Sequence, residues 1–154
     1  MIKIMFICHG NICRSTMAEF VFKDLVKNAG LEKEFYIDSA ATSREEIGNP
    51  IHWGTVEILQ KYDIPYTDHR AQQITKADYD NYDYLLVMDD NNMRNALRFW
   101  GSDPEEKIHR LLDYTDRPGA IADPWYSGDF NVTYRDVLAG CQGFLEYLKK
   151  NKLK

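Results

Sequence analysis

The sequence has no apolar run long enough to cross a membrane and no cluster of basic side chains. Its 154 residues include 19 Lys and Arg against 24 Asp and Glu, which gives a net charge of −5. Binding to nucleic-acid phosphates needs clustered basic side chains, and a membrane-spanning helix needs about 18 or more apolar residues in a row. The apolar start of the chain ends at Cys8. We therefore expect a cytoplasmic protein with neither nucleic-acid nor membrane partners.

Cysteine is also scarce, with Cys8, Cys13 and Cys141 as the three examples. Three cysteines in a chain of this length do not form a disulfide framework. A metal site is disfavoured because no histidine pair has ligand spacing and because Arg14 would repel a cation beside Cys13. We expect reactive or buried thiols and no metal or other cofactor. Cys141 lies on the apolar stripe of a predicted helix, which places it in the core.

The rest of the chain alternates strand patterns with amphipathic helix patterns. Near-continuous apolar runs at 1–7 and 84–88 are typical of strands buried on both faces, and 35–38 and 108–112 are weaker strand candidates. Helical periodicity marks residues 16–29, 53–62, 91–100 and 133–150. The alternation predicts an α/β fold with a parallel sheet flanked by helices on both faces. No repeat or linker interrupts it, so we expect one domain over residues 1–154.

The first predicted strand runs directly into the loop Cys8-His-Gly-Asn-Ile-Cys-Arg-Ser15. Sites in parallel α/β folds lie at the carboxyl ends of strands, which is the place of Cys8. Gly10 and Asn11 tolerate left-handed backbone conformations, and the N-terminus of the following helix attracts anions. Arg14 supplies a planar fork for two phosphate oxygens. The spacing therefore predicts a phosphate-binding loop after the first strand.

The loop also predicts a chemical reaction. Arg14 and the helix N-terminus would stabilise Cys8 as a thiolate, and Ser15 is placed to donate its hydroxyl proton to the sulfur. A thiolate beside a bound phosphate indicates covalent phosphoryl transfer through a phosphocysteine. We expect inorganic phosphate or a similar oxyanion to bind along the loop, at His9, Gly10, Asn11, Ile12, Cys13 and Arg14.

These residues and several later motifs resemble the low-molecular-weight protein tyrosine phosphatases. Besides the loop, the resemblance rests on Asp38-Ser-Ala-Ala-Thr-Ser43, Glu46-Ile-Gly-Asn-Pro50, His69-Arg-Ala-Gln-Gln-Ile-Thr75, Tyr84-Leu-Leu-Val-Met-Asp89 and Asp123-Pro-Trp-Tyr126. The motifs follow one another in order along nearly the whole chain. The resemblance implies a four-stranded parallel sheet and metal-independent hydrolysis of phosphotyrosine in proteins or peptides.

The resemblance also implies a role for each matching residue. Cys8 matches the nucleophile, Arg14 the phosphate clamp and Asp123 the general acid. Supporting roles, in which side chains hold the thiolate and the loop by hydrogen bonds, fall to Ser15, Asn11, Ser39 and His69.

Asp123 lies in a predicted loop just before Pro124, and loops carry catalytic groups more often than strand interiors do. A tyrosine phenolate, with a pKa of about 10, leaves more readily when a carboxyl group gives it a proton, which gains ~10² to 10⁴ in rate. Trp125 and Tyr126 are candidates for the cleft wall because aromatic side chains suit a tyrosine ring. Phosphoserine would be too short to reach the floor of such a cleft.

Three further positions bear on specificity and regulation. Glu45 stands where many relatives carry an aromatic cleft wall, and we hypothesise that it favours substrates with basic neighbours. Ile12 stands where relatives that hydrolyse phosphoarginine commonly carry threonine, so it favours phosphotyrosine. Cys13 is either a small packing residue or a redox partner that captures oxidised Cys8 as a disulfide.

Alternative functions share this loop. One is a protein arginine phosphatase of the same family, and another is a non-hydrolytic phosphocysteine carrier of the kind found in sugar uptake systems. A carrier must retain its phosphate, whereas Asp123 and Arg14 together promote hydrolysis. A thioredoxin-coupled arsenate reductase would need a further cysteine pair, and the sequence has no cysteine between Cys13 and Cys141.

Overall fold

The computed structural model, which describes residues 1–153, contains one four-stranded parallel sheet. The strands lie in the order β2-β1-β3-β4 and comprise β1 (Ile2–Cys8), β2 (Phe35–Ala41), β3 (Tyr84–Val87) and β4 (Ile108–Arg110). The α-helices are α1 (Arg14–Asn28), α2 (Trp53–Lys61), α3 (Asp78–Asn81), α4 (Asp90–Trp100), α5 (Pro124–Ser127) and α6 (Phe130–Asn151). Two 3₁₀ turns, η1 (Glu32–Glu34) and η2 (Leu111–Tyr114), complete the order. The predicted α/β class and the four parallel strands are confirmed.

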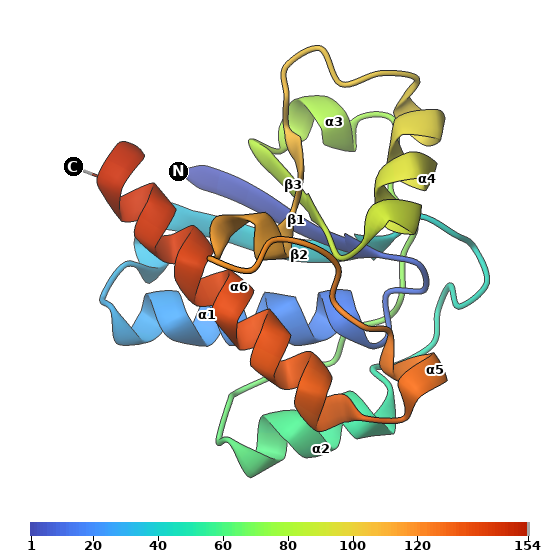
Figure 1. Ribbon diagram of the computed structural model, residues 1–154, viewed down its shortest axis with the longest axis vertical. Helices are drawn as coiled ribbons and strands as arrows, with labels where there is room; N and C mark the ends of the chain where they lie inside the picture. Colours follow the sequence, from blue (N-terminus) through green and yellow to red (C-terminus); the bar gives the residue numbers. More distant parts are fainter. Residues whose placement is uncertain (154) are drawn as a thin grey trace.

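Helices cover both faces of the sheet (Figure 1). Side chains of a strand alternate between its two faces, and β1 is buried on both. Ile4 and Phe6 pack into a core shared with α1 and α6, whereas Met5 and Ile7 pack into a second core shared with α3 and α4. This double burial of residues 4–8 is the reason that the start of the chain reads as a near-continuous apolar run, which the exposed Lys3 interrupts.

The strand order places the end of β1 at a crevice. The chain moves from β1 to β2 on one side of it, and β3 then pairs with β1 on the other side. At such a reversal of direction the connections separate, so an open crevice forms outside the carboxyl ends of the strands. Cys8 is the last residue of β1. The fold therefore places the predicted phosphate-binding loop in this crevice.

The structure differs from the sequence prediction mainly in short elements. Residues 108–112 were predicted as one strand, but β4 ends at Arg110 and the chain turns into η2. The short helices α3 and α5 were not predicted, because four residues are too few to show a helical period. In residues 1–153, no helix combines the length and the apolar character that crossing a bilayer requires.

Candidate active site

The loop between β1 and α1 folds around the Cys8 sulfur. Asn11 has a φ of +59°, a conformation that asparagine tolerates better than most residues, and its backbone N–H donates to Cys8 Sγ over 3.3 Å. Helix α1 begins at Arg14, and the first N–H groups of a helix have no carbonyl partner within the helix. The loop therefore joins a thiol to the N-terminal end of a helix, the kind of place that attracts anions.

Ser15, in the first turn of α1, is the side-chain partner of Cys8. Its Oγ lies 3.1 Å from Cys8 Sγ and accepts a hydrogen bond from Asn11 Nδ2 over 2.7 Å. The Cys8 thiol donates to Ser15 Oγ, and once Cys8 is deprotonated the Ser15 hydroxyl becomes the donor to the sulfur. A hydroxyl donor in this position stabilises a thiolate more than a thiol.

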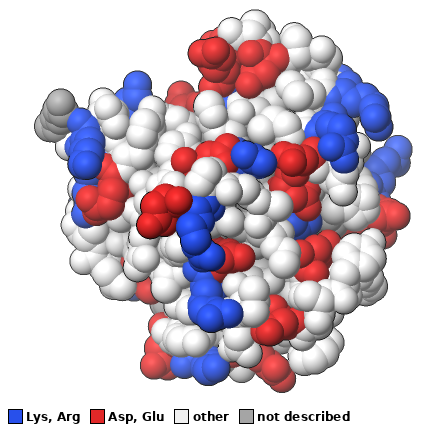
Figure 2. All heavy atoms as spheres, viewed as in Figure 1, with Lys and Arg blue, Asp and Glu red and all other residues white. Residues whose placement is uncertain are grey.

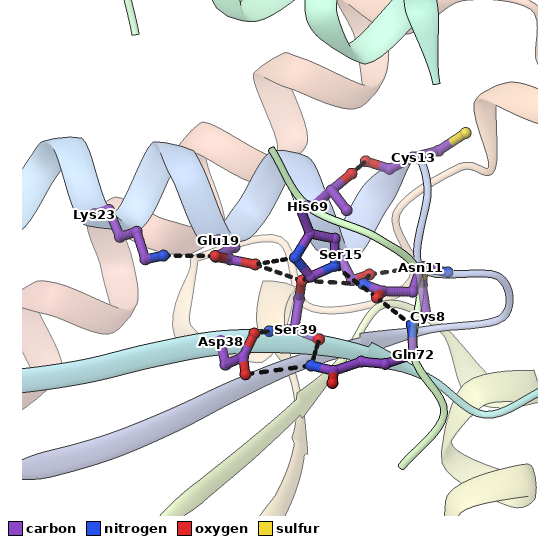
Figure 3. Close-up of polar contacts among 11 residues, drawn as sticks. Cys8, Asn11, Cys13, Ser15, Glu19, Lys23, Asp38, Ser39, His69 and Gln72 are labelled. Atoms are coloured by element: carbon purple, nitrogen blue, oxygen red, sulfur yellow. Dashed lines mark hydrogen bonds and ion pairs between the residues drawn. The ribbon is translucent and has the colours of Figure 1, made fainter. Parts of the chain in front are cut away.

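Behind the loop, Asn11 joins the two supporting residues that the sequence predicted (Figure 3). Its Nδ2 donates to Ser39 Oγ over 3.0 Å, and its Oδ1 lies 2.8 Å from His69 Nε2. The same Oδ1 accepts from the backbone N–H of Gln72 over 3.2 Å. The side-chain amide of Asn11 is thus held from β2 and from the 69–72 segment at once.

Glu19 completes this network and was missed from the sequence. Its Oε1 accepts from Ser39 Oγ over 2.6 Å and lies 3.6 Å from His69 Nδ1, while its Oε2 pairs with Lys23 Nζ at 2.6 Å. The carboxylate is almost fully buried. Because the Ser39 hydroxyl donates its one hydrogen bond to Glu19, Ser39 Oγ can only accept from Asn11. The helical spacing of Ser15, Glu19 and Lys23, four residues apart on one face of α1, was an available signal.

Arg14 is the most constrained charged side chain of the site. Its guanidinium, only 3% exposed, donates from Nη1 to Asp89 Oδ2 over 2.7 Å and to the Ile121 carbonyl over 2.8 Å. Burial acts to lower the pKa of Arg14, but Cys8 and the hydrogen bond to Asp89 outweigh it and raise that pKa above its ordinary value. Asp89 was not predicted as a site residue, although its place directly after a central strand was a usable signal.

Cys8 and Arg14 share one pocket with the predicted acid. This pocket, which we call the catalytic pocket, has a volume of about 370 Å³. It is lined by Cys8, His9, Gly10, Ile12, Cys13, Arg14, Glu45, Glu46, Asp123, Trp125 and Tyr126. Asp123 Oδ2 lies 3.5 Å from Arg14 Nη2, and its other oxygen accepts from the Trp125 N–H, which caps α5. Trp125 and Tyr126 are 60% and 87% exposed at the pocket mouth. The pocket therefore brings together Cys8, Arg14 and Asp123 with the predicted cleft residues, whereas Asn11, which the sequence also assigned to phosphate binding, is fully buried behind the loop and does not line it.

The rim of the catalytic pocket carries a side-chain contact that the sequence did not predict. His9 Nε2 contacts the carboxylate of Glu45. Both side chains are at least half exposed. Glu45 therefore has a side-chain partner at the rim instead of standing alone.

The other two thiols are buried. Burial, reinforced by Cys8 and Asp123, raises the pKa of Cys13 to about 12, so Cys13 is a neutral thiol near pH 7. Cys141 lies in the main core, where its Sγ is 3.8 Å from the Ala18 carbonyl, as the sequence predicted.

Among residues 1–153, one group has metal-ligand chemistry, namely Glu19, Asp38 and His69, whose ligand atoms lie within 4.8 Å of one another. Its carboxylates already have partners. Lys23 pairs with Glu19, and Asp38 accepts from the Ser39 N–H and from Gln72 Nε2. The ammonium group of Lys23 would repel a metal cation bound to Glu19. We therefore interpret this group as part of the hydrogen-bond network around Asn11 and not as a metal site.

Comparisons with known proteins agree with this geometry. Residues 3–154 match the family model described as low molecular weight phosphotyrosine protein phosphatase. A relative from Bacillus subtilis, the low molecular weight protein-tyrosine-phosphatase YfkJ, is 38% identical over 154 residues, which is 99% of each chain. The crystal structure of YfkJ matches with a TM-score of 0.95 over 99% of this chain and 97% of that one.

Two further proteins extend the range of similarity. The low molecular weight phosphotyrosine protein phosphatase of Gallus gallus is 40% identical over 149 residues, which is 94% of each chain. The structure of a Drosophila arginine phosphatase matches with a TM-score of 0.88 at 29% identity, over 98% of this chain and all of that one. From the full-length family match and these relatives, the chain belongs to the low molecular weight phosphotyrosine protein phosphatase family.

Proposed function

We propose that this protein hydrolyses phosphotyrosine in proteins and peptides, and simple aryl phosphates, through a phosphocysteine on Cys8. The observation that carries the proposal is that Cys8, Arg14 and Asp123 line one pocket of about 370 Å³. Cys8 has a hydrogen-bond donor in Ser15, Arg14 is fixed by Asp89, and Asp123 lies beside Arg14. A nucleophile, a phosphate clamp and an acid in one pocket are what phosphoryl transfer requires.

In the first step the Cys8 thiolate attacks the phosphorus, the S–P bond forms and the bond to the phenolic oxygen breaks. Asp123 in its acid form gives its proton to the departing oxygen, so tyrosine leaves neutral. Arg14 and the first N–H groups of α1 neutralise the phosphate oxygens throughout. Because Arg14 is held by Asp89 before substrate arrives, little reorganisation is needed when charge develops.

In the second step water attacks the phosphocysteine and the S–P bond breaks. The Asp123 carboxylate takes a proton from the attacking water, which restores the carboxyl group, and the Cys8 thiolate is restored as inorganic phosphate leaves. Ser15 aids this step because its hydroxyl proton is directed at the departing sulfur by the hydrogen bond from Asn11. The proposed cycle therefore closes with atoms and protons balanced.

The walls of the catalytic pocket favour a phosphorylated tyrosine. Trp125 and Tyr126 stand at its mouth while Cys8 lies at its floor, so an aromatic ring fits between the wall and the nucleophile. Ile12 is buried and lines the pocket beside Cys8, and it has no hydroxyl to orient water on a phosphoarginine. Ile12 therefore disfavours the second candidate, an arginine phosphatase of the same family. Asp123 disfavours the third, a phosphocysteine carrier, because it promotes hydrolysis of the phosphocysteine.

The test is steady-state hydrolysis of para-nitrophenyl phosphate in buffer containing a metal chelator. We expect full activity in the wild type, none in Cys8→Ser and a loss of ~10² to 10⁴ in kcat for Asp123→Ala. Cys141→Ala serves as the control, since it removes a core thiol outside the site and is expected to keep kcat. Full activity in Cys8→Ser, or a requirement for added metal, would overturn the mechanism. Equal turnover of phosphoarginine and phosphotyrosine peptides would overturn the substrate preference.

A further inference from the structure

A second groove lies beside the catalytic pocket. It has a volume of about 840 Å³ and runs between the start of α2 and the α5–α6 junction, which lie next to each other in Figure 1. We refer to it as the α2–α5 groove. Trp125 lines both this groove and the catalytic pocket. A polypeptide whose phosphotyrosine enters the catalytic pocket can therefore reach the α2–α5 groove with a neighbouring side chain.

An aromatic cluster forms the wall of the α2–α5 groove. The His52 ring stacks on Phe130 with centroids 5.1 Å apart and lies 5.2 Å from Trp53 and 5.9 Å from Trp125. Phe130 is locked in place because its ring lies against Gly54, where an added Cβ would come within 2.5 Å of it. Trp53 and Trp125 are nevertheless 67% and 60% exposed. Two large aromatic side chains beside this cluster are thus largely uncovered.

The charged groups of the α2–α5 groove are mainly acidic. Glu57 and Asp129 line it against one cation, Lys61. The Lys61 ammonium is directed at Asn131 Oδ1, 3.1 Å away, and at the Tyr62 ring, 5.3 Å from its centroid. Asp129 caps α6, so Glu57 is the carboxylate most available to a ligand. Figure 2 shows acidic groups around the uncharged surface over α5, while Lys and Arg gather over α4.

We infer that the α2–α5 groove binds an arginine or lysine side chain that flanks the phosphotyrosine of a substrate, an inference that rests on the proposed function. Aromatic faces attract cations, and a guanidinium group stacks on them while it pairs with a carboxylate. A neutral apolar side chain would cover the aromatic faces but leave the Glu57 carboxylate poorly solvated, and an acidic side chain would be repelled by Glu57. Arginine suits both the aromatic faces and the carboxylate.

The test uses matched phosphotyrosine peptides in which a single arginine is moved one position at a time on either side of the phosphotyrosine. Glutamine replaces it in the control series. At the positions that reach the α2–α5 groove, arginine is expected to lower KM about fivefold relative to glutamine, with kcat unchanged. Para-nitrophenyl phosphate, which cannot reach the groove, reports the catalytic site separately.

Four variants test whether the preference for arginine peptides arises in the α2–α5 groove. Glu57→Gln and Trp53→Leu are expected to remove most of the arginine preference without changing turnover of para-nitrophenyl phosphate. Trp53→Phe keeps an aromatic face and is expected to retain the preference. Glu32→Gln, an exposed carboxylate outside the groove, controls for a general loss of negative charge and is expected to change nothing.

The outcomes separate the inference from the proposed function. Equal KM for the arginine and glutamine series, or a preference that survives both Glu57→Gln and Trp53→Leu, would overturn the inference while hydrolysis of para-nitrophenyl phosphate stands. If hydrolysis itself fails, calorimetric binding of the same peptides to the Cys8→Ser protein still reports the groove. Tighter binding of arginine than glutamine peptides would then support the groove, and equal binding would refute it.

Discussion

At the scale of single residues, Asn11 has two structural roles that can be separated. Its backbone adopts a φ of +59°, and its side-chain amide links Ser15, Ser39, His69 and Gln72. The chain of donors runs from Asn11 toward the buried Glu19 in one direction and toward the Cys8 sulfur in the other. Asn11 therefore sets both the shape of the loop and the direction of the Ser15 proton.

Two substitutions distinguish these roles. Asn11→Gly keeps the left-handed backbone but loses the amide, so kcat for para-nitrophenyl phosphate is expected to fall because Ser15 is no longer oriented. Asn11→Ala loses the amide too and adds about 1–2 kcal/mol of backbone strain, so its free energy of unfolding in urea is expected to be lower than that of Asn11→Gly. Equal kcat in wild type and Asn11→Gly would show that the amide does not position Ser15.

Cys13 remains a proposed redox partner of Cys8. Its pKa of about 12 predicts how the rate of disulfide formation depends on pH. After peroxide converts Cys8 to a sulfenic acid, the Cys13 thiolate must attack that sulfur and form the S–S bond as the S–O bond breaks, and the departing hydroxide takes a proton from solvent to become water. Because the thiolate fraction below pH 12 rises about tenfold per pH unit, disulfide closure is expected to be slow near pH 7 and to accelerate as the pH rises. Mass spectrometry of peroxide-treated protein at increasing pH measures this.

The matched variant for that experiment is Cys13→Ser. Its activity is expected to be lost to peroxide and not restored by dithiothreitol, since Cys8 proceeds to sulfinic acid. Full recovery of Cys13→Ser by dithiothreitol, equal to wild type, would remove the protective role.

At the scale of elements, the junction of β3 and α4 connects fold stability to the site through Asp89. One carboxylate oxygen caps α4 by accepting from the Asn92 N–H over 2.7 Å, and the other holds Arg14. A single residue therefore begins α4 and holds Arg14, the proposed phosphate clamp, which extends from a different helix.

Asp89→Asn and Asp89→Ala separate the cap from the charge. Asparagine is a good N-cap, so Asp89→Asn is expected to weaken inhibition by inorganic phosphate mainly because Arg14 loses its charged partner. Asp89→Ala also loses the cap and leaves a buried charge without this partner, at a cost of about 3–5 kcal/mol in the free energy of unfolding. Urea denaturation and phosphate inhibition constants measure both effects. Unchanged phosphate affinity in both variants would contradict the positioning role of Asp89.

The elements also show what the sequence could predict. The long helices have a clear helical period and the two buried strands are near-continuous apolar runs, and the structure contains all of them. Loop 8–15 was found from its distinctive spacing, and Asp123 and Glu45 were assigned through the family resemblance. Glu46, which also lines the catalytic pocket, was not predicted. Asp89, Glu19 and the His9–Glu45 pair were missed because their roles depend on which side chains meet in space. Local patterns do not contain that information.

At the scale of the whole molecule, several buried or partly buried groups stay protonated to a higher pH in the folded state than in the unfolded chain. Burial raises the pKa of Cys13 from 9.0 to about 12 and that of Tyr84 from 10.0 to about 12, and it raises the pKa values of Tyr82, Tyr114 and Cys141 as well. The unfolded chain therefore loses these protons at lower pH than the folded protein does. The stability they contribute is full below about pH 9 and is lost as the pH rises toward 12.

We accordingly expect the free energy of unfolding to fall steadily with pH above 9.0, the ordinary thiol pKa. Urea denaturation at a series of alkaline pH values measures it. Tyr84→Phe is expected to reduce the slope above pH 10.0, because it removes one group that the unfolded chain deprotonates. Tyr126→Phe, at an 87% exposed position, is the control and is expected to leave the slope unchanged. A free energy of unfolding that stays constant to pH 11 would contradict this account.

The fold as a whole brings together residues that are far apart in the sequence. Cys8 ends β1, Asp89 follows β3 and Asp123 precedes α5, and the strand order places all three at the same edge of the sheet. The central claim is that the phosphoryl group is transferred to the Cys8 sulfur in this crevice before it is hydrolysed. All other roles proposed for the site depend on that step.

The most direct measurement is rapid quenching of the Asp123→Ala variant during its reaction with para-nitrophenyl phosphate, followed by mass spectrometry of its peptides. Nitrophenolate leaves readily without an acid, whereas hydrolysis of the phosphocysteine is slowed when Asp123 is absent, so the intermediate is expected to accumulate. The account predicts a burst of nitrophenolate equal to the enzyme concentration and one phosphoryl group on the peptide that contains Cys8. Phosphate on another residue, or turnover with no phosphorylated peptide, would contradict it.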